Sequence, residues 1–106
     1  MAWSVYAAHF FGAALVANSV PHFTAGIAGQ PLHSPFASPP FRGLSSPRTN
    51  VVWALANLTV AYLLLVQVGP LNLSSLPDAS VTFVGFGAMA LLCSRSFTRL
   101  RQRGSG

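Results

Sequence analysis

Three long apolar runs divide the chain, at residues 3–20, 51–68 and 79–97. An eighteen-residue helix is about 27 Å long, which is close to the roughly 30 Å thickness of the hydrocarbon core of a bilayer. No positive residue precedes the first run and no small-x-small cleavage site follows it, so we interpret it as a mature span rather than a signal peptide. The pattern predicts an all-α membrane protein with three transmembrane helices.

Helix-capping and helix-breaking residues indicate where each predicted helix begins and ends. Pro21 is predicted to end the first helix, because the residue before a proline is biased away from helical geometry. Asn50 is predicted to be the N-cap of the second helix, and Gly69 with Pro70 forms its stop signal. Asp78 reads as the N-cap of the third helix, where its carboxylate would also complement the helix dipole.

The connection between the first two helices, residues 21–50, is long and rich in proline and phenylalanine. Structureless loops of this length are uncommon in compact proteins and are usually functional or disordered. Recurrent phenylalanines argue against disorder. We therefore expect a packed cap in the headgroup region, or a re-entrant stretch if protein surrounds it.

Composition and charge fit this topology. Only 7% of the 106 residues are charged and 52% are hydrophobic, whereas about a quarter of a soluble domain is charged. One membrane domain, residues 1–106, is therefore expected. The arginines follow the first and third apolar runs, and the other two flanks carry none; they are Arg42, Arg48, Arg95, Arg99, Arg101 and Arg103.

The positive-inside rule then sets the orientation. The connection at 21–50 and the basic tail at 98–106 are expected in the cytoplasm, and the N-terminus and residues 69–78 outside, in a cell inner (plasma) membrane. Arg42 and Arg48 are expected to contact anionic lipid headgroups. The same pattern, with arginines flanking apolar runs, argues against nucleic-acid binding.

Several chemistries are excluded by the side chains present. Asp78 is the only acidic residue, so paired-carboxylate catalysis is impossible within one chain. Cys93 is the only cysteine and cannot form an intrachain disulfide. His22 and His33 are the only pair of potential metal ligands that lie near each other in the sequence, whereas zinc usually takes four ligands. We expect no cofactor and no metal, with these two histidines as the weak candidates.

Polar residues inside apolar spans are costly and raise a functional hypothesis. Asn18 and His22, four residues apart, would share a side of the first helix if it ran briefly past Pro21. Asn57, roughly 10 Å in from the cytoplasmic end of the second helix, would face them. With Gly26 and Gly29, which permit close backbone approach, these residues form the candidate ligand-binding site.

His9 is expected to lie apart from this cluster. It is nine residues before Asn18, which is about 180° around a straight helix. We interpret it as an imidazole hydrogen-bonded across a helix interface. The third helix carries small residues around Gly85 and is expected to pack closely against another helix or subunit.

One sequence motif resembles a known family. The pattern N-S-V-P-H-F-x-x-G-I-x-G at residues 18–29, followed by S-P-F at 34–36 and N-x-x-W-x-x-x-N at 50–57, resembles a family of small bacterial integral-membrane proteins without assigned function. The resemblance covers residues 18–57. It implies a bacterial membrane protein and no particular substrate.

Three functions remain open. The chain is expected to be a non-catalytic membrane protein, a subunit of a homo-oligomer or of a larger membrane complex, with the bilayer and other subunits as its partners. Alternatively, it binds or transports a small molecule, ion or lipid near Asn18, His22 and Asn57. The third possibility is a membrane enzyme or metalloprotein that uses His9, His22 or His33.

Overall fold

The computed structural model describes residues 2–105, and for residues 103–105 only the backbone. The described part is mostly helical. Its elements in chain order are α1 (Trp3–Ile27), β1 (Leu32–His33), β2 (Leu44–Ser45), α2 (Pro47–Tyr62), the π-helical turn η1 (Leu63–Gln67) and α3 (Leu76–Ser105). The two short strands pair antiparallel, with Leu32 opposite Ser45, so that residues 28–46 form a small hairpin.

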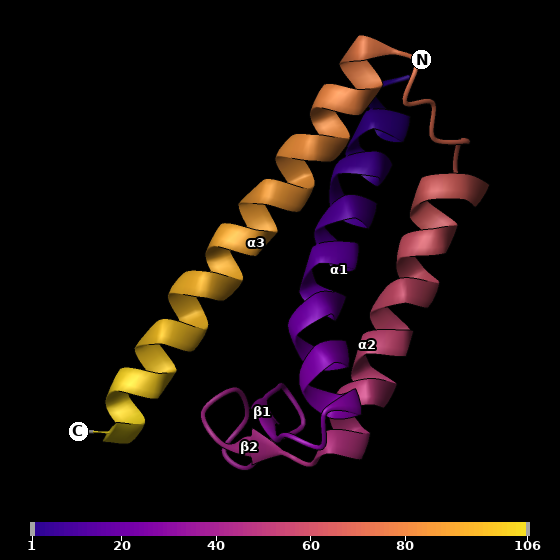
Figure 1. Ribbon diagram of the computed structural model, residues 1–106. Helices are drawn as coiled ribbons and strands as arrows, with labels where there is room; N and C mark the ends of the chain where they lie inside the picture. Colours follow the sequence, from indigo (N-terminus) through magenta and orange to yellow (C-terminus); the bar gives the residue numbers. More distant parts are fainter. Residues whose placement is uncertain (1, 106) are drawn as a thin grey trace.

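The three long helices run antiparallel to their neighbours in sequence, and α2 and α3 lie on either side of α1 (Figure 1). The hairpin, the start of α2 and the C-terminal part of α3 lie at one end, which we call the hairpin end. The N-terminus and residues 68–75 lie at the other end, with the start of α3. The molecule is elongated, 47 × 24 × 21 Å.

The first helix does not end at Pro21, as the sequence pattern predicts, but continues to Ile27. A proline inside a helix removes only its own N–H bond, here to the carbonyl of Ala17, and the turns on either side can persist. The extension places His22 on the helix. It also shortens the connection from residues 21–50 to residues 28–46.

The end of α1 is a Schellman motif. The backbone N–H of Gln30 donates to the carbonyl of Ala25 (2.8 Å), and that of Gly29 donates to the carbonyl of Gly26 (3.1 Å). Gly29 has a φ of +72°. Because side chains with a Cβ rarely adopt this left-handed conformation, glycine is the natural residue here.

The second helix also begins earlier than predicted. Ser46 caps it, with its hydroxyl accepting a hydrogen bond from the N–H of Thr49 (3.1 Å), and Pro47 takes the first helical position. Asn50 is therefore inside the first turns of α2 and is not its N-cap. Beyond Tyr62 the helix widens into η1, where the N–H of Val68 donates to the carbonyl five residues back, at 3.0 Å.

The third helix starts at Leu76, and Asp78 lies within its first turn rather than at the N-cap. The N–H of Ala79 donates to the carbonyl of Ser75 (2.9 Å), so Ser75 precedes the helix as its cap. The helix continues through the predicted basic tail as far as Ser105. The predictions for the Arg103 side chain and for residue 106 lie outside the described residues.

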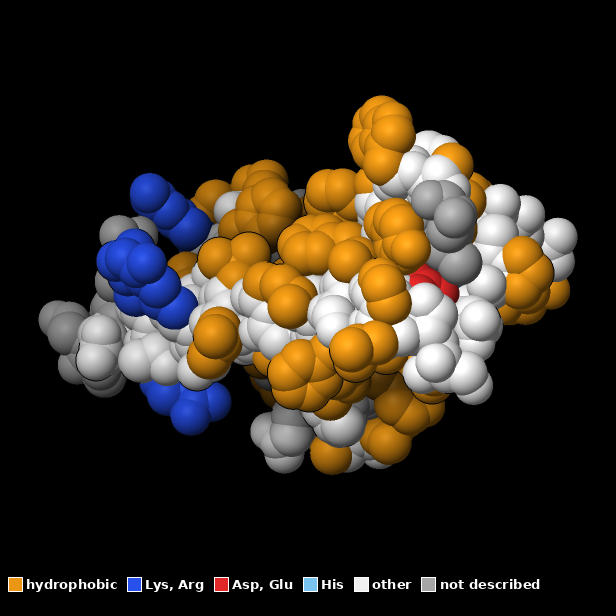
Figure 2. All heavy atoms as spheres, turned by 90° about the horizontal axis from the view of Figure 1, so that it is seen from above, with side chains coloured by type: hydrophobic (Ala, Val, Ile, Leu, Met, Phe, Trp, Pro, Cys, Tyr) orange, Lys and Arg blue, Asp and Glu red, His pale blue; other side chains and the backbone are white. Residues whose placement is uncertain are grey.

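The packing of side chains is inverted relative to that of a soluble protein. Within the described residues, the buried apolar side chains are all alanines: Ala8, Ala13, Ala14, Ala17, Ala37, Ala54 and Ala61. Large apolar side chains face outward instead; Trp3 is 80% exposed and Phe83 78%. Orange apolar side chains cover much of the surface in Figure 2, with the arginines gathered toward one end.

Three helical stretches are long and apolar enough to cross a membrane: Trp3–Ile27, Pro47–Gln67 and Leu76–Gln102. Their mean hydropathies are 1.2, 1.7 and 1.5. The predicted set of three apolar, span-length helices is thus confirmed.

α1 and α3 approach each other closely at Gly85. A Cβ added there would lie 2.2 Å from the carbonyl oxygen of Phe10, which is far inside van der Waals contact. Two residues on, a Cβ at Gly87 would meet nothing within 4 Å. Gly85 therefore sets the distance between the two helices, whereas Gly87 faces away from the bundle.

This contrast gives a direct test. Gly85→Ala must push α3 away from α1, and we expect a loss of about 1–3 kcal/mol in the free energy of unfolding, as for other overpacked sites. Gly87→Ala is the matched control. It adds the same methyl group to open space and should stabilise α3 by about 0.5–1 kcal/mol.

The measurement is unfolding of the purified protein in a mild detergent, followed by circular dichroism. Equal stability of the two variants would contradict the close contact at Gly85.

Candidate functional site

A chain of polar side chains joins the three helices near the hairpin end. Asn18 on α1 donates from Nδ2 to Oδ1 of Asn57 on α2 (3.1 Å), and Asn57 donates to the carbonyl of Trp53 (2.8 Å). On the other side, the thiol of Cys93 on α3 donates to Oδ1 of Asn18 (3.5 Å). The structure thus brings together Asn18 and Asn57, as expected from the sequence.

His22 is held by a different residue, Asn50, which is fully buried. The amide nitrogen of Asn50 lies within hydrogen-bonding distance of the carbonyl oxygens of Leu32 (3.2 Å), Ser45 (3.2 Å) and Ser46 (3.1 Å). Because carbonyl oxygens only accept, this atom must be the NH₂ group, and its partner Oδ1 must be an acceptor. His22 Nδ1, 2.7 Å from Oδ1, therefore donates its proton to Asn50.

This arrangement settles the tautomer of neutral His22. With the proton on Nδ1, Nε2 carries a free lone pair. Nε2 has no hydrogen-bond partner in the described part of the chain, although His22 is only 3% exposed. The ring is steadied by edge-on contacts with Trp53 and Phe97, at centroid distances of 6.4 Å and 5.8 Å.

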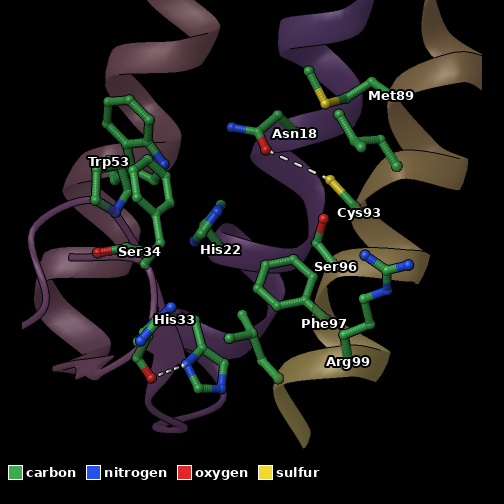
Figure 3. A pocket seen from close by; sticks show the side chains of 15 residues that line it. Asn18, His22, His33, Ser34, Trp53, Met89, Cys93, Ser96, Phe97 and Arg99 are labelled. Carbon is green, nitrogen blue, oxygen red and sulfur yellow. Dashed lines mark hydrogen bonds between the residues drawn. The ribbon is translucent and has the colours of Figure 1, made fainter. Parts of the chain in front are cut away.

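The free side of His22 faces a cavity of about 540 Å³ between α1, the hairpin and the C-terminal part of α3 (Figure 3). Figure 3 shows Asn18 and His22 on one side of this space and Cys93, Ser96 and Phe97 on the other. The remaining lining residues are His33, Ser34, Pro35, Phe41, Arg42, Trp53, Met89, Leu92, Arg99 and Leu100. The wall is thus mainly apolar, with a few polar and basic groups.

His33 reaches the same cavity from the hairpin. Its Nδ1 lies 3.0 Å from the carbonyl oxygens of both Arg42 and Gly43, so Nδ1 again carries the proton. The Phe97 ring contacts both imidazoles, with centroids 5.8 Å from His22 and 6.4 Å from His33. Among the described residues, no three His, Cys, Asp or Glu side chains come together as metal ligands would.

The other sequence candidates have other surroundings. Gly26 packs against the start of α2, where an added Cβ would lie 2.7 Å from the carbonyl of Pro47, and Gly29 forms the turn after α1. Neither glycine lines the cavity. Arg42 does line it, whereas Arg48 is exposed in the first turn of α2, away from it.

His9 lies toward the other end of the molecule, apart from the cluster as expected, and it is completely buried. Its Nε2 donates to the carbonyl of Gly69 (2.5 Å), and its Nδ1 lies 2.5 Å from the buried carboxylate of Asp78 on α3. Asp78 also accepts from the N–H of Asn72 (2.9 Å). One proton lies between Nδ1 and the carboxylate whichever atom holds it, so the pair is electrically neutral overall.

The predicted hydrogen bond of His9 across a helix interface is therefore found, but the sequence pattern did not indicate its partner. The importance of Asn50 was likewise not predicted. The only available signal was its place in the motif that begins at Asn50 and ends at Asn57.

Comparison with known proteins adds no relative: no protein-family model, characterised protein or solved structure matches the chain. The resemblance suggested by residues 18–57 stays a prediction.

The role of Asn50 can be tested by stability. Asn50→Ala removes the donor from three carbonyls and the acceptor from His22, and we expect it to cost at least about 1–3 kcal/mol, the cost of one buried polar group left unpaired. Asn72→Ala is the control, because the exposed Asn72 side chain accepts only the N–H of Ser74 (3.0 Å).

Denaturant unfolding in detergent measures both variants. If Asn50→Ala were as stable as Asn72→Ala, the hairpin would not depend on the Asn50 amide.

Proposed function

We propose that the chain is a small multi-pass protein of a bacterial inner membrane, with the hairpin end and the C-terminus in the cytoplasm. Outward-facing phenylalanines and leucines on span-length helices support the membrane placement, because lipid can cover such surfaces where water would not. The arginines with described side chains lie in the hairpin, in the first turn of α2 or in the C-terminal part of α3, which are all at the hairpin end. The positive-inside rule gives this orientation for that distribution.

Within this setting we propose that the protein is a non-catalytic binding module for a small molecule. The observation that carries the proposal is the cavity of about 540 Å³ at the hairpin end, on which Asn18 and His22 converge. Pockets that are mostly apolar and carry a few convergent polar groups are the usual form of small-molecule sites. The bilayer is the other partner of the protein.

Binding fits the geometry better than catalysis does. The Cys93 thiol donates to the Asn18 amide and not to an imidazole, so no base activates it as a nucleophile. Asp78, the only carboxylate side chain of the protein, is paired with His9, away from the cavity. The side chains around His22 are therefore suited to hold a ligand in place.

A specific observation also favours the second candidate, a subunit of a homo-oligomer or of a larger membrane complex. Only 11% of the most apolar stretch of α3 is buried, compared with 39% for α1. Gly87 on this helix opens onto free space. Small residues on the outer face of a membrane helix allow another helix to approach closely.

The binding proposal is tested by blocking the cavity. Ser96→Trp fills the space that Ser96 lines, whereas Thr98→Trp adds the same ring to an exposed position of α3 that does not line the cavity. Native mass spectrometry of protein purified from membranes should show a bound small molecule with the original chain and with Thr98→Trp, and its loss with Ser96→Trp.

A molecule retained equally by both tryptophan variants would lie elsewhere, and the absence of any bound molecule from the original chain would count against the binding module.

Subunit association is tested at Gly87. If α3 packs through this glycine, Gly87→Ile should reduce the oligomer fraction by about tenfold or more, because the larger side chain prevents close approach. Ala88→Ile, about 100° around the helix, should leave it nearly unchanged. Crosslinking in native membranes measures both, and a strictly monomeric original chain with no captured partner would remove this candidate.

A further inference from the structure

A second space, lined almost entirely by apolar atoms, shares two of its lining residues with the cavity. A groove of about 350 Å³ lies between α1 and α3, and it shares Cys93 and Phe97 with the cavity. Its other lining residues are Ala17, Val20, Pro21, Phe86, Ala90 and Ser94. A single occupant of both spaces would need a polar part and an apolar part.

The two spaces overlap along α3 but are offset in depth. On α3 the groove begins at Phe86 and the cavity at Met89, three residues or about 4.5 Å farther along the helix, and only the cavity extends beyond Phe97 to Arg99 and Leu100. The cavity is the one nearer to the hairpin end. An amphiphile would therefore place its polar head at the arginine-rich end and its chain toward the middle of the bundle, as a lipid of the same leaflet does.

The positive charge of the residues that line the cavity indicates which head group an amphiphile would place there. Arg42 lines the cavity from the hairpin and Arg99 lines it from α3, so a basic residue borders the cavity on each of these two walls. No acidic side chain lines the cavity, and Asp78 is buried against His9 at a distance from it. Guanidinium groups bind phosphate oxygens in a paired geometry that ammonium groups do not offer.

The imidazoles add hydrogen bonding to this charge. His22 and His33 both use Nδ1 to bind protein acceptors, and within the described residues neither ring forms a hydrogen bond through Nε2. Each Nε2 can accept a proton from an acidic hydroxyl of a phosphate or, once protonated, donate to a phosphate oxygen. Both states favour a head that carries ionisable oxygen atoms.

We propose that the cavity and the groove together bind an anionic lipid with a phosphate head, with the phosphate at Arg42 and Arg99 beside His22 and the acyl chain along the groove. Basic pockets between membrane helices on the cytoplasmic side are a known means of holding such headgroups. This assignment rests on the proposed binding function and specifies its ligand class.

The experiment uses the full-length protein in a nonionic detergent and lysophosphatidic acid as the probe. Binding is followed by native mass spectrometry and by the shift of the thermal midpoint. Lysophosphatidylcholine with the same acyl chain has a zwitterionic head, and glycerol 3-phosphate has the head without the chain. We expect lysophosphatidic acid to bind at least about tenfold more tightly than either, a difference of about 1.4 kcal/mol.

A matched pair of double variants locates the site. Arg42→Gln with Arg99→Gln removes both cavity arginines and should weaken binding of lysophosphatidic acid by about tenfold or more. Arg48→Gln with Arg95→Gln removes the same charge from exposed positions outside the cavity and should change binding by less than about twofold. The four arginines are exposed, so both double variants should fold, which their thermal midpoints without lipid would verify.

Other outcomes would overturn the assignment. Equal weakening by both double variants would indicate surface charge alone, and equal binding of lysophosphatidylcholine would indicate an uncharged lipid site. Glycerol 3-phosphate binding as tightly as lysophosphatidic acid would indicate a free phosphate compound. If the cavity retains a molecule that Ser96→Trp displaces but does not bind lysophosphatidic acid, the lipid assignment fails while the binding module stands.

Discussion

The three helices are held together without a core of large apolar side chains, and the rest of the structure depends on this constraint. Alanines fill the buried positions, and phenylalanine, leucine and valine side chains point outward. Burying alanine removes little apolar area from water, so such a bundle would gain little from the hydrophobic effect. Close backbone approach, as at Gly85, and buried hydrogen bonds must supply the specificity of packing.

The buried polar pairs lie where the helices meet. His9 joins α1 to the start of α3 through Asp78, and Asn18 joins α1 to α2 through Asn57. An unpaired polar group would be costly in an apolar environment, so each pair opposes separation and sliding of the two helices that it connects.

α3 is held against α1 more tightly near its start than toward the hairpin end, and this difference explains the cavity. Near the start of α3, Gly85 and the pair formed by His9 and Asp78 hold the helix tightly against α1. Toward the hairpin end α3 diverges from α1 (Figure 1), and the two helices are joined there by the long hydrogen bond from Cys93 to Asn18. The hairpin occupies part of the resulting space, and the cavity is what remains of it.

The helices could be predicted from the sequence because runs of apolar residues of span length are a local property of the chain. The ends of the helices were harder to predict. Pro21 breaks a single hydrogen bond and does not end α1, since the following turns reach the Schellman motif at Gly29. Asn50 and Asp78 were interpreted as caps because both residue types often cap helices.

Their actual partners lie far away in sequence. His22 is 28 residues from Asn50, and His9 is 69 residues from Asp78. No periodicity or spacing rule connects residues at such distances without a known arrangement of the helices. The candidate pair of Asn18 and Asn57 could be predicted, in contrast, because both residues were placed toward the cytoplasmic end of neighbouring spans.

Asn50 links the stability of the hairpin to the properties of the cavity. Its amide nitrogen closes the hairpin on the start of α2 through the carbonyls of Leu32, Ser45 and Ser46. That same orientation leaves Oδ1 to accept from His22 and directs the lone pair of His22 to the remaining nitrogen, Nε2. The state of the His22 ring that lines the cavity thus follows from the way the hairpin is closed.

The coupling also acts in the reverse direction. If the proposed ligand is held by Nε2 of His22, Nδ1 must keep its proton and its bond to Asn50, so the bound state would favour the closed hairpin. By linkage, whatever stabilises the hairpin would then strengthen binding to the same extent. Under the binding proposal, the order of the short segment between α1 and α2 and the occupancy of the cavity that it lines would therefore depend on each other.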